Sequence, residues 1–207
     1  MADTVKHPET YFSGLVPKRD EILQQLEKEA KEEGIPIAGP VVGQLLFVLA
    51  RAAGAANILE LGAAHGYSAI YLGRACTPGG RVVTLENDSE MAQRARENIE
   101  KAGLSNIVSV KEQDALESLA ELEGPIDLVF MDIEKKDYRA ALDLFTPLVR
   151  PGGLLVADNT AFVDAKGFNG AIYNASEWQS VQIFSYLPMH SAAHDGICLA
   201  VRMTGQK

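Results

Sequence analysis

Hydrophobic and polar positions follow two alternating patterns through most of this chain. Short, nearly continuous apolar runs predict buried strands at residues 57–61, 81–85, 107–111, 126–131 and 153–157. Between these runs, apolar residues recur at helical spacing and predict helices from about residue 66, at 88–102, at 115–121 and at 136–148. Strands that alternate with helices indicate a parallel sheet covered on both faces, so we expect an α/β fold.

The last part of the chain departs from this alternation. A helix expected at about 166–176 is followed by two apolar runs, 178–184 and 196–201, with no helical pattern between them. Two strands joined in this way pair antiparallel. We therefore expect a seven-stranded, mostly parallel sheet with an antiparallel C-terminal hairpin at its edge.

The first part of the chain is rich in charge. Residues 18–33 have the pattern of an amphipathic helix, which Gly34-Ile35-Pro36 ends, and a more apolar helix is expected at 41–53. No linker, repeat or low-complexity run separates these helices from the rest of the chain. The expected organisation is a single domain over residues 1–207, with N-terminal helices in residues 1–55 and the α/β core in residues 56–207.

The turn after the first expected strand has the features of a nucleotide site. Gly62 can take the backbone angles of a tight turn, and Gly66 lets the helix pack close to the strand or lets a ligand approach. Ala64 stands where a dinucleotide site needs another glycine beside the pyrophosphate, so NAD is disfavoured. Glu60 is a poor neighbour for a phosphate and a good one for a cation. S-adenosylmethionine suits such a turn, because it carries a sulfonium, an ammonium and a ribose but no phosphate.

The next expected strand also ends in an acid. Glu86 follows the run 81–85, and a carboxylate at this point can accept hydrogen bonds from both hydroxyls of a ribose. An oxidoreductase would use the same carboxylate for its dinucleotide. Glu86 therefore leaves a nucleotide-dependent oxidoreductase open as an alternative.

Acid and amide side chains end two later strands. Asp132 follows one apolar run, and Asp158 and Asn159 follow the next. Because the carboxyl ends of parallel strands meet at one edge of the sheet, we expect these three side chains to lie together. Hard oxygen donors of this kind suit Mg²⁺, Mn²⁺ or Ca²⁺. Lys135 would lie one short turn away.

Together these motifs resemble those of the cation-dependent class I O-methyltransferases, the group that contains catechol and caffeoyl-coenzyme A O-methyltransferases and their bacterial relatives. The resemblance extends over about residues 37–202. It is carried by Gly43-Gln44-Leu45-Leu46, Glu60-Leu61-Gly62, Gly66-Tyr67-Ser68, Glu86, Asp114-Ala115-Leu116, Asp127-Leu128-Val129-Phe130-Met131-Asp132, Lys135, Tyr138, Pro151-Gly152-Gly153, Asp158-Asn159, Phe168-Asn169 and Asp195-Gly196.

This resemblance implies a Rossmann-like class I methyltransferase fold. It also implies transfer of a methyl group from S-adenosylmethionine to a hydroxyl of a catechol-like or other phenolic small molecule. A divalent cation, Mg²⁺ before Mn²⁺ or Ca²⁺, and a homodimer are implied as well. The implied residue roles are catalysis by Lys135 and Asp132, metal binding by Asp132, Asp158 and Asn159, and cofactor binding by Glu60, Gly62, Gly66, Ser68, Glu86, Asp114 and Asp132.

The chain departs from the family pattern at several positions. Val42 stands where the family often has an acid, and Glu134 where it usually has an Asp or an aromatic residue. Thr160-Ala161-Phe162 stands where the family often has an apolar residue, Leu and Trp. That segment lines the acceptor pocket in relatives, so a methyltransferase with a non-phenolic acceptor remains a second alternative.

Composition and charge limit the classes of protein to which this chain can belong. At 207 residues, with 47% apolar and 23% charged residues, the chain is typical of a globular protein with a sizeable core. A net charge of −9 disfavours nucleic acid as a partner. Cys76 and Cys198 lie among apolar residues and are expected to be buried thiols. Residues 1–9 lack a signal-peptide core and no apolar run suits a membrane span, so we expect a cytoplasmic protein without membrane contact.

Three histidines and one acid remain as further candidates. His190 and His194 have a spacing that invites a metal site, but nothing in their loop fixes both on one face, which favours substrate contact. His65 is interpreted as either a ligand contact or a partly exposed turn residue. Asp195 is expected to cap or shape the turn before the last strand.

Overall fold

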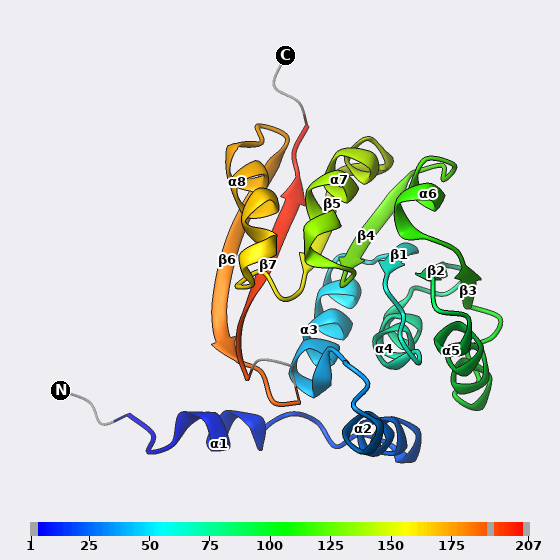
Figure 1. Cartoon of the computed structure of the whole chain (residues 1–207), viewed down its shortest axis with the longest axis vertical. Helices are drawn as coiled ribbons and strands as arrows, with labels where there is room; N and C mark the ends of the chain where they lie inside the picture. The colour runs from blue at the N-terminus through cyan, green and yellow to red at the C-terminus, as the bar shows by residue number, and fades with distance from the viewer. Residues whose placement is uncertain (1–3, 190–192, 205–207) are drawn as a thin grey trace.

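The structure is a computed structural model that describes residues 4–189 and 193–204, and it has the expected α/β architecture. The strands are β1 (Asn57–Leu61), β2 (Arg81–Glu86), β3 (Val108–Glu112), β4 (Ile126–Met131), β5 (Val149–Ala157), β6 (Trp178–Tyr186) and β7 (His194–Arg202). They form one sheet in the order β3-β2-β1-β4-β5-β7-β6 (Figure 1). Strands β1 to β5 pair in parallel, and β7 pairs antiparallel with both β5 and β6. The predicted mixed sheet is confirmed.

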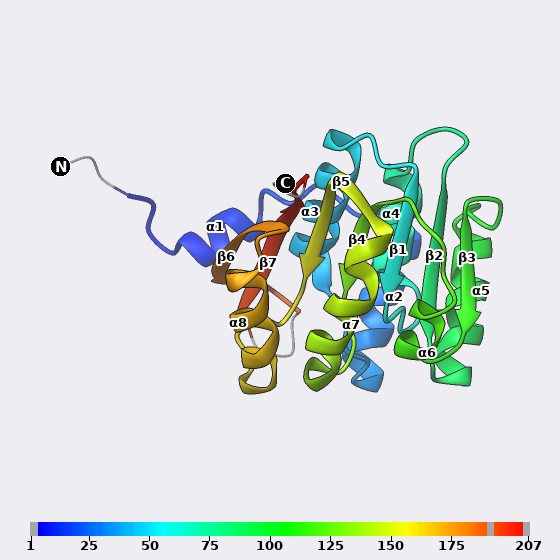
Figure 2. The same ribbon diagram turned by 90° about the horizontal axis from the view of Figure 1, so that it is seen from above.

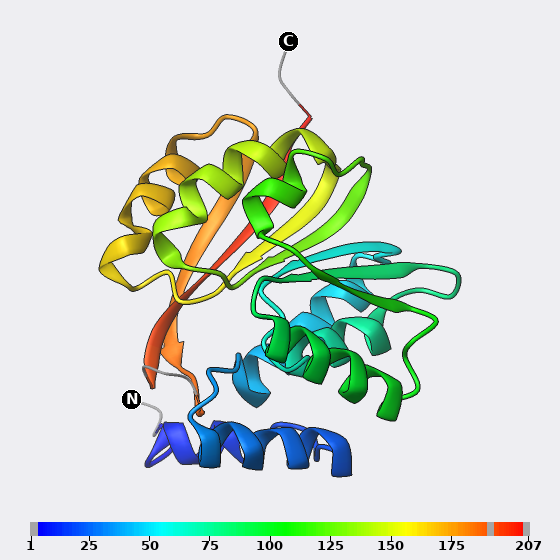
Figure 3. The same cartoon turned by 45° about the vertical axis from the view of Figure 1, so that its right-hand side comes forward.

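Helices cover both faces of this sheet (Figure 2). They are α1 (Pro8–Ser13), α2 (Glu21–Glu33), α3 (Gly39–Ala52), α4 (Tyr67–Ala75), α5 (Ser89–Lys101), α6 (Ala115–Leu119), α7 (Tyr138–Phe145) and α8 (Lys166–Asn174), with 3-10 turns η1 (Lys135–Asp137), η2 (Thr146–Leu148) and η3 (Val163–Ala165). Figure 3 shows α3, α4 and α5 on one face, with α2 packed outside them, and α6, α7 and α8 on the other face. Among the described residues, no helix has both the length and the apolar character needed to cross a membrane.

Alternate residues of each strand point to opposite faces of the sheet, so each strand contributes to a core on both faces. In β1 and β4, Ile58 pairs with Leu128 and both side chains pack toward α3, α4 and α5. The neighbouring pair, Leu59 and Val129, packs toward α6, α7 and α8. Every residue of β4 is buried, which explains why this strand has a continuous apolar run rather than an alternating one.

Strand β5 differs from its predicted bounds. It was expected at 153–157, but it begins at Val149 and continues through Pro151-Gly152-Gly153. Its pairing with β4 is regular from Leu154 onward and shifts in register before that point. Proline offers no N–H to the ladder and Gly152 has a φ of 79°, so these residues form an irregularity inside the strand rather than a turn before it.

The helix expected at 136–148 is also subdivided. Only its centre, α7, is α-helical, and the 3-10 turns η1 and η2 precede and follow it. Pro147 lies at the start of η2, where a missing N–H cannot continue the α-helical bonding pattern. The short helix α1 was not predicted, and none of its residues is buried.

Candidate active site

A cavity of about 700 Å³ opens at the carboxyl edge of the sheet. The ends of β1, β2 and β4 contribute to its lining, together with residues 34–38 after α2 and the loop after β5. Most of the predicted site residues line it, namely Gly62, Ser68, Glu86, Asp114, Asp132, Lys135 and Asn159. Glu60, Gly66 and Asp158 are not among its lining residues.

The turn between β1 and α4 depends on its glycines. Gly62 has a φ of 92°, and a Cβ at this position would lie 2.2 Å from the backbone oxygen of Asp132. This residue therefore allows both the left-handed turn and the close approach of the β1 and β4 ends. Gly66 has a φ of 94°, and its nearest neighbour is Ala95 of α5 rather than a strand residue. It thus allows α4 to pack closely against α5, whereas the prediction had given the strand or a ligand as the neighbour.

Glu86 holds this turn from the end of β2. Its Oε2 accepts hydrogen bonds from the backbone N–H of Ala63, at 3.1 Å, and of Ala64, at 2.8 Å. Its Oε1 accepts from the N–H of Asp88 at 3.0 Å. The sequence had suggested only a ribose contact for this carboxylate. Its second task is to fix a turn in which Ala64 has the unusual φ of 44°.

Glu60 lies in the middle of the protein, with no exposed surface. The hydroxyls of Ser68 and Thr84 lie near its carboxylate without closing a hydrogen bond of ordinary geometry, so both Glu60 oxygens are buried without a partner. Burial raises the pKa of this carboxyl to about 7, and the nearby carboxylates of Asp132 and Glu86 add to the rise. A buried, poorly solvated carboxyl beside the cofactor turn is a receptive neighbour for a cation.

Asp132 and Lys135 form an ion pair on the cavity wall. Lys135 Nζ donates to Asp132 Oδ1 at 2.9 Å, and about a fifth of each side chain is exposed. The ammonium also lies 5.7 Å from the centre of the Tyr138 ring. The Tyr138 hydroxyl is within hydrogen-bond distance of the carbonyls of Met131 and Asp158, so this buried ring ties the ends of β4 and β5 together.

Asp158 and Asn159 follow β5 and are buried. Asn159 has a φ of 50°, and its side-chain Nδ2 donates to Asp195 Oδ2 at 2.7 Å. Asp195 lies inside β7, is fully buried, and also accepts from the N–H groups of Ala161 and Gly196. The predicted role of Asp195 as a turn cap is therefore incomplete, because this side chain orients the Asn159 amide. Nothing in the local sequence around Asp195 indicates that contact.

The donor set fits a hard divalent cation. Asn159 Nδ2 donates to Asp195, the Asn159 amide oxygen is a hard donor, and Asp132 and Asp158 supply two carboxylates. The described residues include no group of three or more His, Cys, Asp or Glu that could hold a metal. A metal at this edge would therefore depend on the Asn159 oxygen beside the two carboxylates.

The remaining candidates are placed as follows. Asp114 caps α6, because its Oδ1 accepts from the N–H groups of Leu116 and Glu117, and it also borders the cavity. His194 begins β7 and packs against aromatic rings of β6, while His190 lies outside the described residues. The interpretation of His65 as a partly exposed turn residue is wrong, because this side chain is completely buried, and it is not among the residues that line the cavity.

A mostly parallel sheet with this strand order and a cofactor turn at its carboxyl edge defines the Rossmann-like class I methyltransferases, which use S-adenosylmethionine. The chain belongs to the O-methyltransferase family, whose family model matches residues 15–180. It is thus an S-adenosylmethionine-dependent O-methyltransferase, which sets the oxidoreductase alternative aside.

Relatives agree with this assignment. The chain is 38% identical over 155 residues to a catechol O-methyltransferase of Niastella koreensis, over 72% of this chain and 70% of that protein. It is 42% identical over 118 residues to a catechol O-methyltransferase of Mycobacterium tuberculosis, over 56% of this chain and 54% of that protein. The solved O-methyltransferase of Bacillus cereus in complex with SAH is similar in structure, with a TM-score of 0.85, 29% identity, and coverage of 94% of this chain and 96% of that one.

Proposed function

We propose that this enzyme methylates a hydroxyl of a catechol-like small molecule and requires a divalent cation at Asp132, Asp158 and Asn159. One observation carries the proposal. The Lys135–Asp132 ion pair and Asn159 line the same cavity as the cofactor turn, so the acceptor and the methyl donor would share one cavity. The catechol O-methyltransferase names of two relatives favour this acceptor class.

The cofactor end of the cavity suits S-adenosylmethionine. Gly62 and Ser68 lie at the turn, where the methionine part of the cofactor would bind, and Asp114 borders the place for the adenine. Glu86 uses three of the roughly four lone-pair sites of a carboxylate on backbone N–H groups, which leaves Oε1 a site for one ribose hydroxyl. Glu60, buried behind Ser68, would favour the cofactor by its negative charge.

Asp132, Asp158 and Asn159 would hold the metal and thereby fix the acceptor. A divalent cation lowers the pKa of a phenol hydroxyl from its ordinary value of about 10, as it does for bound water. Asn159 is preset for this task because Asp195 orients its amide. The buried Tyr138 fixes the spacing of the β4 and β5 ends that carry the three ligands.

Lys135 would handle the acceptor proton. Its ammonium is held between the Asp132 carboxylate and the face of the Tyr138 ring, on the wall of the cavity. As an ammonium, Lys135 stabilises an anionic phenolate oxygen; as a free amine, it accepts the hydroxyl proton. Both roles act on the oxygen that attacks the methyl group, so they belong to the chemical step rather than to cofactor binding.

The acceptor end of the cavity is acidic. Glu134, Asp137 and Asp164 line the cavity together with the proposed metal ligands Asp132 and Asn159, and Lys135 is the one basic side chain among the described lining residues. Such a lining disfavours an acceptor that carries several phosphates, such as a coenzyme A ester. Phe162, 40% exposed, offers an aromatic side chain to a planar ring. A small catechol that lacks strong negative charge fits this surface best.

Metal removal tests the proposal. Exhaustive chelation should abolish methylation of catechol, and Mg²⁺ or Mn²⁺ should restore it. Asp158→Ala should weaken Mn²⁺ binding, measured by calorimetry, more than Asp158→Asn does, because Asn keeps one oxygen donor. A chelated enzyme that methylates its best acceptor at the full rate would overturn the metal requirement. A panel of catechols and non-phenolic acceptors that yields transfer only to the latter would overturn the acceptor class.

We also propose a homodimer. Helix α1 has no buried residue: its Tyr11 and Phe12 are 49% and 62% exposed, and Leu15, which follows the helix, is 61% exposed. A second apolar surface, a groove of about 380 Å³, lies over β5, β7 and β6 and includes Val181 and Val201. Exposed apolar surfaces of this kind favour association. Sedimentation of wild type and of a Phe12→Glu, Leu15→Glu variant tests it, and a monomeric wild type would exclude the dimer.

A further inference from the structure

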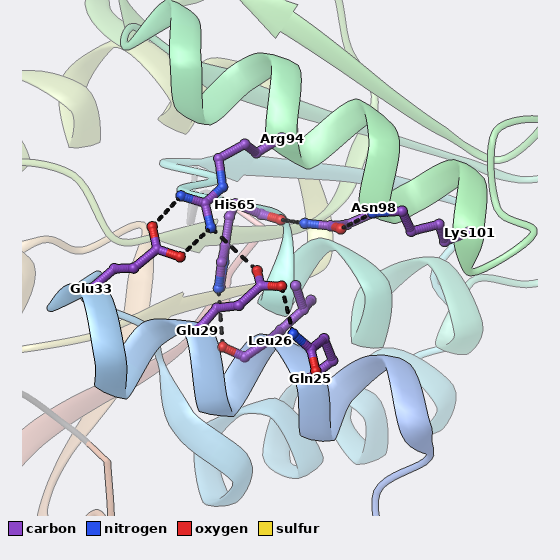
Figure 4. A network of polar contacts seen from close by, with 8 residues as sticks. All are labelled: Gln25, Leu26, Glu29, Glu33, His65, Arg94, Asn98 and Lys101. Carbon is purple, nitrogen blue, oxygen red and sulfur yellow. Dashed lines mark hydrogen bonds and ion pairs between the residues drawn. The ribbon is translucent and has the colours of Figure 1, made fainter.

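The turn that carries the cofactor site is tied to an N-terminal helix by the buried side chain of His65. His65 lies in the turn between β1 and α4, and its ring points to α2 (Figure 4). Its Nε2 is 3.2 Å from the carbonyl oxygen of Leu26. A carbonyl oxygen only accepts hydrogen bonds, so Nε2 must carry the hydrogen. Burial lowers the pKa of His65, which agrees with a neutral ring.

The same turn is held from two other sides. Asn98 of α5 donates through Nδ2 to the backbone oxygen of His65 at 3.0 Å. Glu86 accepts the N–H groups of Ala63 and Ala64 on the opposite side. The turn is therefore built between α2, α5 and the end of β2. Of these three supports, α2 alone lies outside the sheet and its directly covering helices (Figure 3).

Helix α2 in turn supports a wall of the cavity. Gly34 ends the helix with a φ of 74°, and residues 34–38 then line the cavity beside Gly62, Ala63 and Ala64. A movement of α2 would displace this wall and, through His65, the turn that faces it. The cofactor turn and residues 34–38 line the same cavity, and both therefore depend on the position of α2.

A second buried contact joins α2 to the start of α4, because the Tyr67 hydroxyl donates to Glu27 Oε1 at 2.7 Å. The ion pairs of α2 with α5 are closer to solvent. Arg94 of α5 pairs with Glu33 at 2.7 Å and with Glu29 at 3.2 Å, but Glu33 is about half exposed. Ion pairs at the surface contribute little, because water and salt screen them. The His65 ring is completely buried, so loss of its hydrogen bond to Leu26 would leave a buried polar group without a partner. His65 is the side chain that joins the turn itself to α2, and Tyr67, the first residue of α4, supplies a neighbouring contact to the same helix.

We propose that His65 is a positioning residue that couples cofactor binding at the turn to the docking of α2 and of residues 34–38. The proposal rests on the proposed placement of the cofactor at this turn. A ligand that holds the turn in place makes the His65–Leu26 contact more favourable, and a docked α2 strengthens the turn by the same amount. His65 does not reach the reacting atoms, so its effect should fall on cofactor affinity rather than on the chemical step.

Two substitutions separate this coupling from a simple loss of packing. His65→Gln keeps a donor at about the position of Nε2, whereas His65→Met fills similar volume without a donor. His65→Met should weaken binding of S-adenosylhomocysteine about tenfold by calorimetry, and His65→Gln by no more than about threefold. The KM for S-adenosylmethionine should rise in parallel, while kcat at saturating cofactor stays within about twofold of wild type.

Backbone hydrogen exchange supplies a readout that needs no variant. In wild type, S-adenosylhomocysteine should slow exchange in α2 and residues 34–38 more than in β6 and β7. In His65→Met, it should still protect the turn but should protect α2 less than in wild type, where the His65 contact adds to that of Tyr67. If His65→Met does not fold, the wild-type exchange pattern decides.

The coupling is overturned if folded His65→Met binds S-adenosylhomocysteine as wild type does, or if the ligand leaves wild-type α2 exchange unchanged while the turn is protected. A different result is expected if the cofactor does not bind at this turn. In that case S-adenosylhomocysteine would protect neither the turn nor the end of β2, and Glu86→Gln would bind it normally.

Discussion

Replacing Glu60 by Gln tests whether the carboxyl behind the cofactor turn is held at an energetic cost. Glu60 is completely buried, and neither of its oxygens has a hydrogen-bond partner. Burial raises its pKa from 4.5 to about 7. The folded protein therefore binds a proton at Glu60 in a pH range where the unfolded chain has lost it. The contribution of Glu60 to stability is complete below pH 4.5 and is lost as the pH rises through 7.

The magnitude follows from the difference between these two pKa values. Each unit corresponds to about 1.4 kcal/mol, so ionised Glu60 costs the folded protein about 3 kcal/mol above neutral pH. Glutamine has the same shape, never ionises, and can donate to the Thr84 hydroxyl oxygen, which is also buried without a partner. Glu60→Gln should therefore raise the free energy of unfolding by up to about 3 kcal/mol at about pH 8 and by much less at about pH 5.

Urea unfolding of the cofactor-free protein, followed by circular dichroism across this pH range, measures the effect. The exposed Glu100 provides the matched control, because Glu100→Gln also removes one carboxylate but no buried one. A difference between Glu60→Gln and wild type that stays constant from about pH 5 to about pH 8 would refute the reasoning. Cofactor binding gives an independent check: a cation favours ionised Glu60, so wild type should release a proton on binding near neutral pH and Glu60→Gln should not.

Three further predictions concern the site and the sheet that carries it. Lys135→Met should lower kcat by about a hundredfold or more in a methyl-transfer assay, with little change in cofactor affinity by calorimetry; near-normal turnover would exclude a role in the chemical step. Gly62→Ala should abolish measurable S-adenosylhomocysteine binding, because its Cβ would overlap the Asp132 backbone oxygen at 2.2 Å and its φ is 92°; normal binding would contradict the described turn. Asp127 accepts from Arg150 and from two backbone N–H groups at the start of β1, which lower its pKa, so its stabilisation is present above pH 3.8 and is lost as the pH falls through the lowered value. Asp127→Ala should reduce the free energy of unfolding by about 2–4 kcal/mol while the folded enzyme keeps its kcat.

Local sequence determined the main features of the fold. The strands of a parallel sheet are buried on both faces, so their apolar runs are continuous, and β4 could be located to the residue. The same rule places the carboxyl ends of such strands at one edge, which is why Glu86, Asp132 and Asn159 could be expected at a shared site. Gly62 could be predicted because only glycine readily takes its backbone angles.

Features that depend on which elements pack together could not be read from the sequence. His65 meets Leu26, 39 residues earlier, and Asn159 meets Asp195, 36 residues later. Neither contact has a local pattern, because a buried polar side chain takes whatever partner the neighbouring element presents. Hydrophobic periodicity fixes which face of a helix or strand is buried, but the tertiary structure alone decides which polar groups on those faces come within hydrogen-bond distance. For this reason the sequence determined the sheet and its site edge, while only the folded chain revealed that Asp195 orients Asn159 and that α2 supports the cofactor turn.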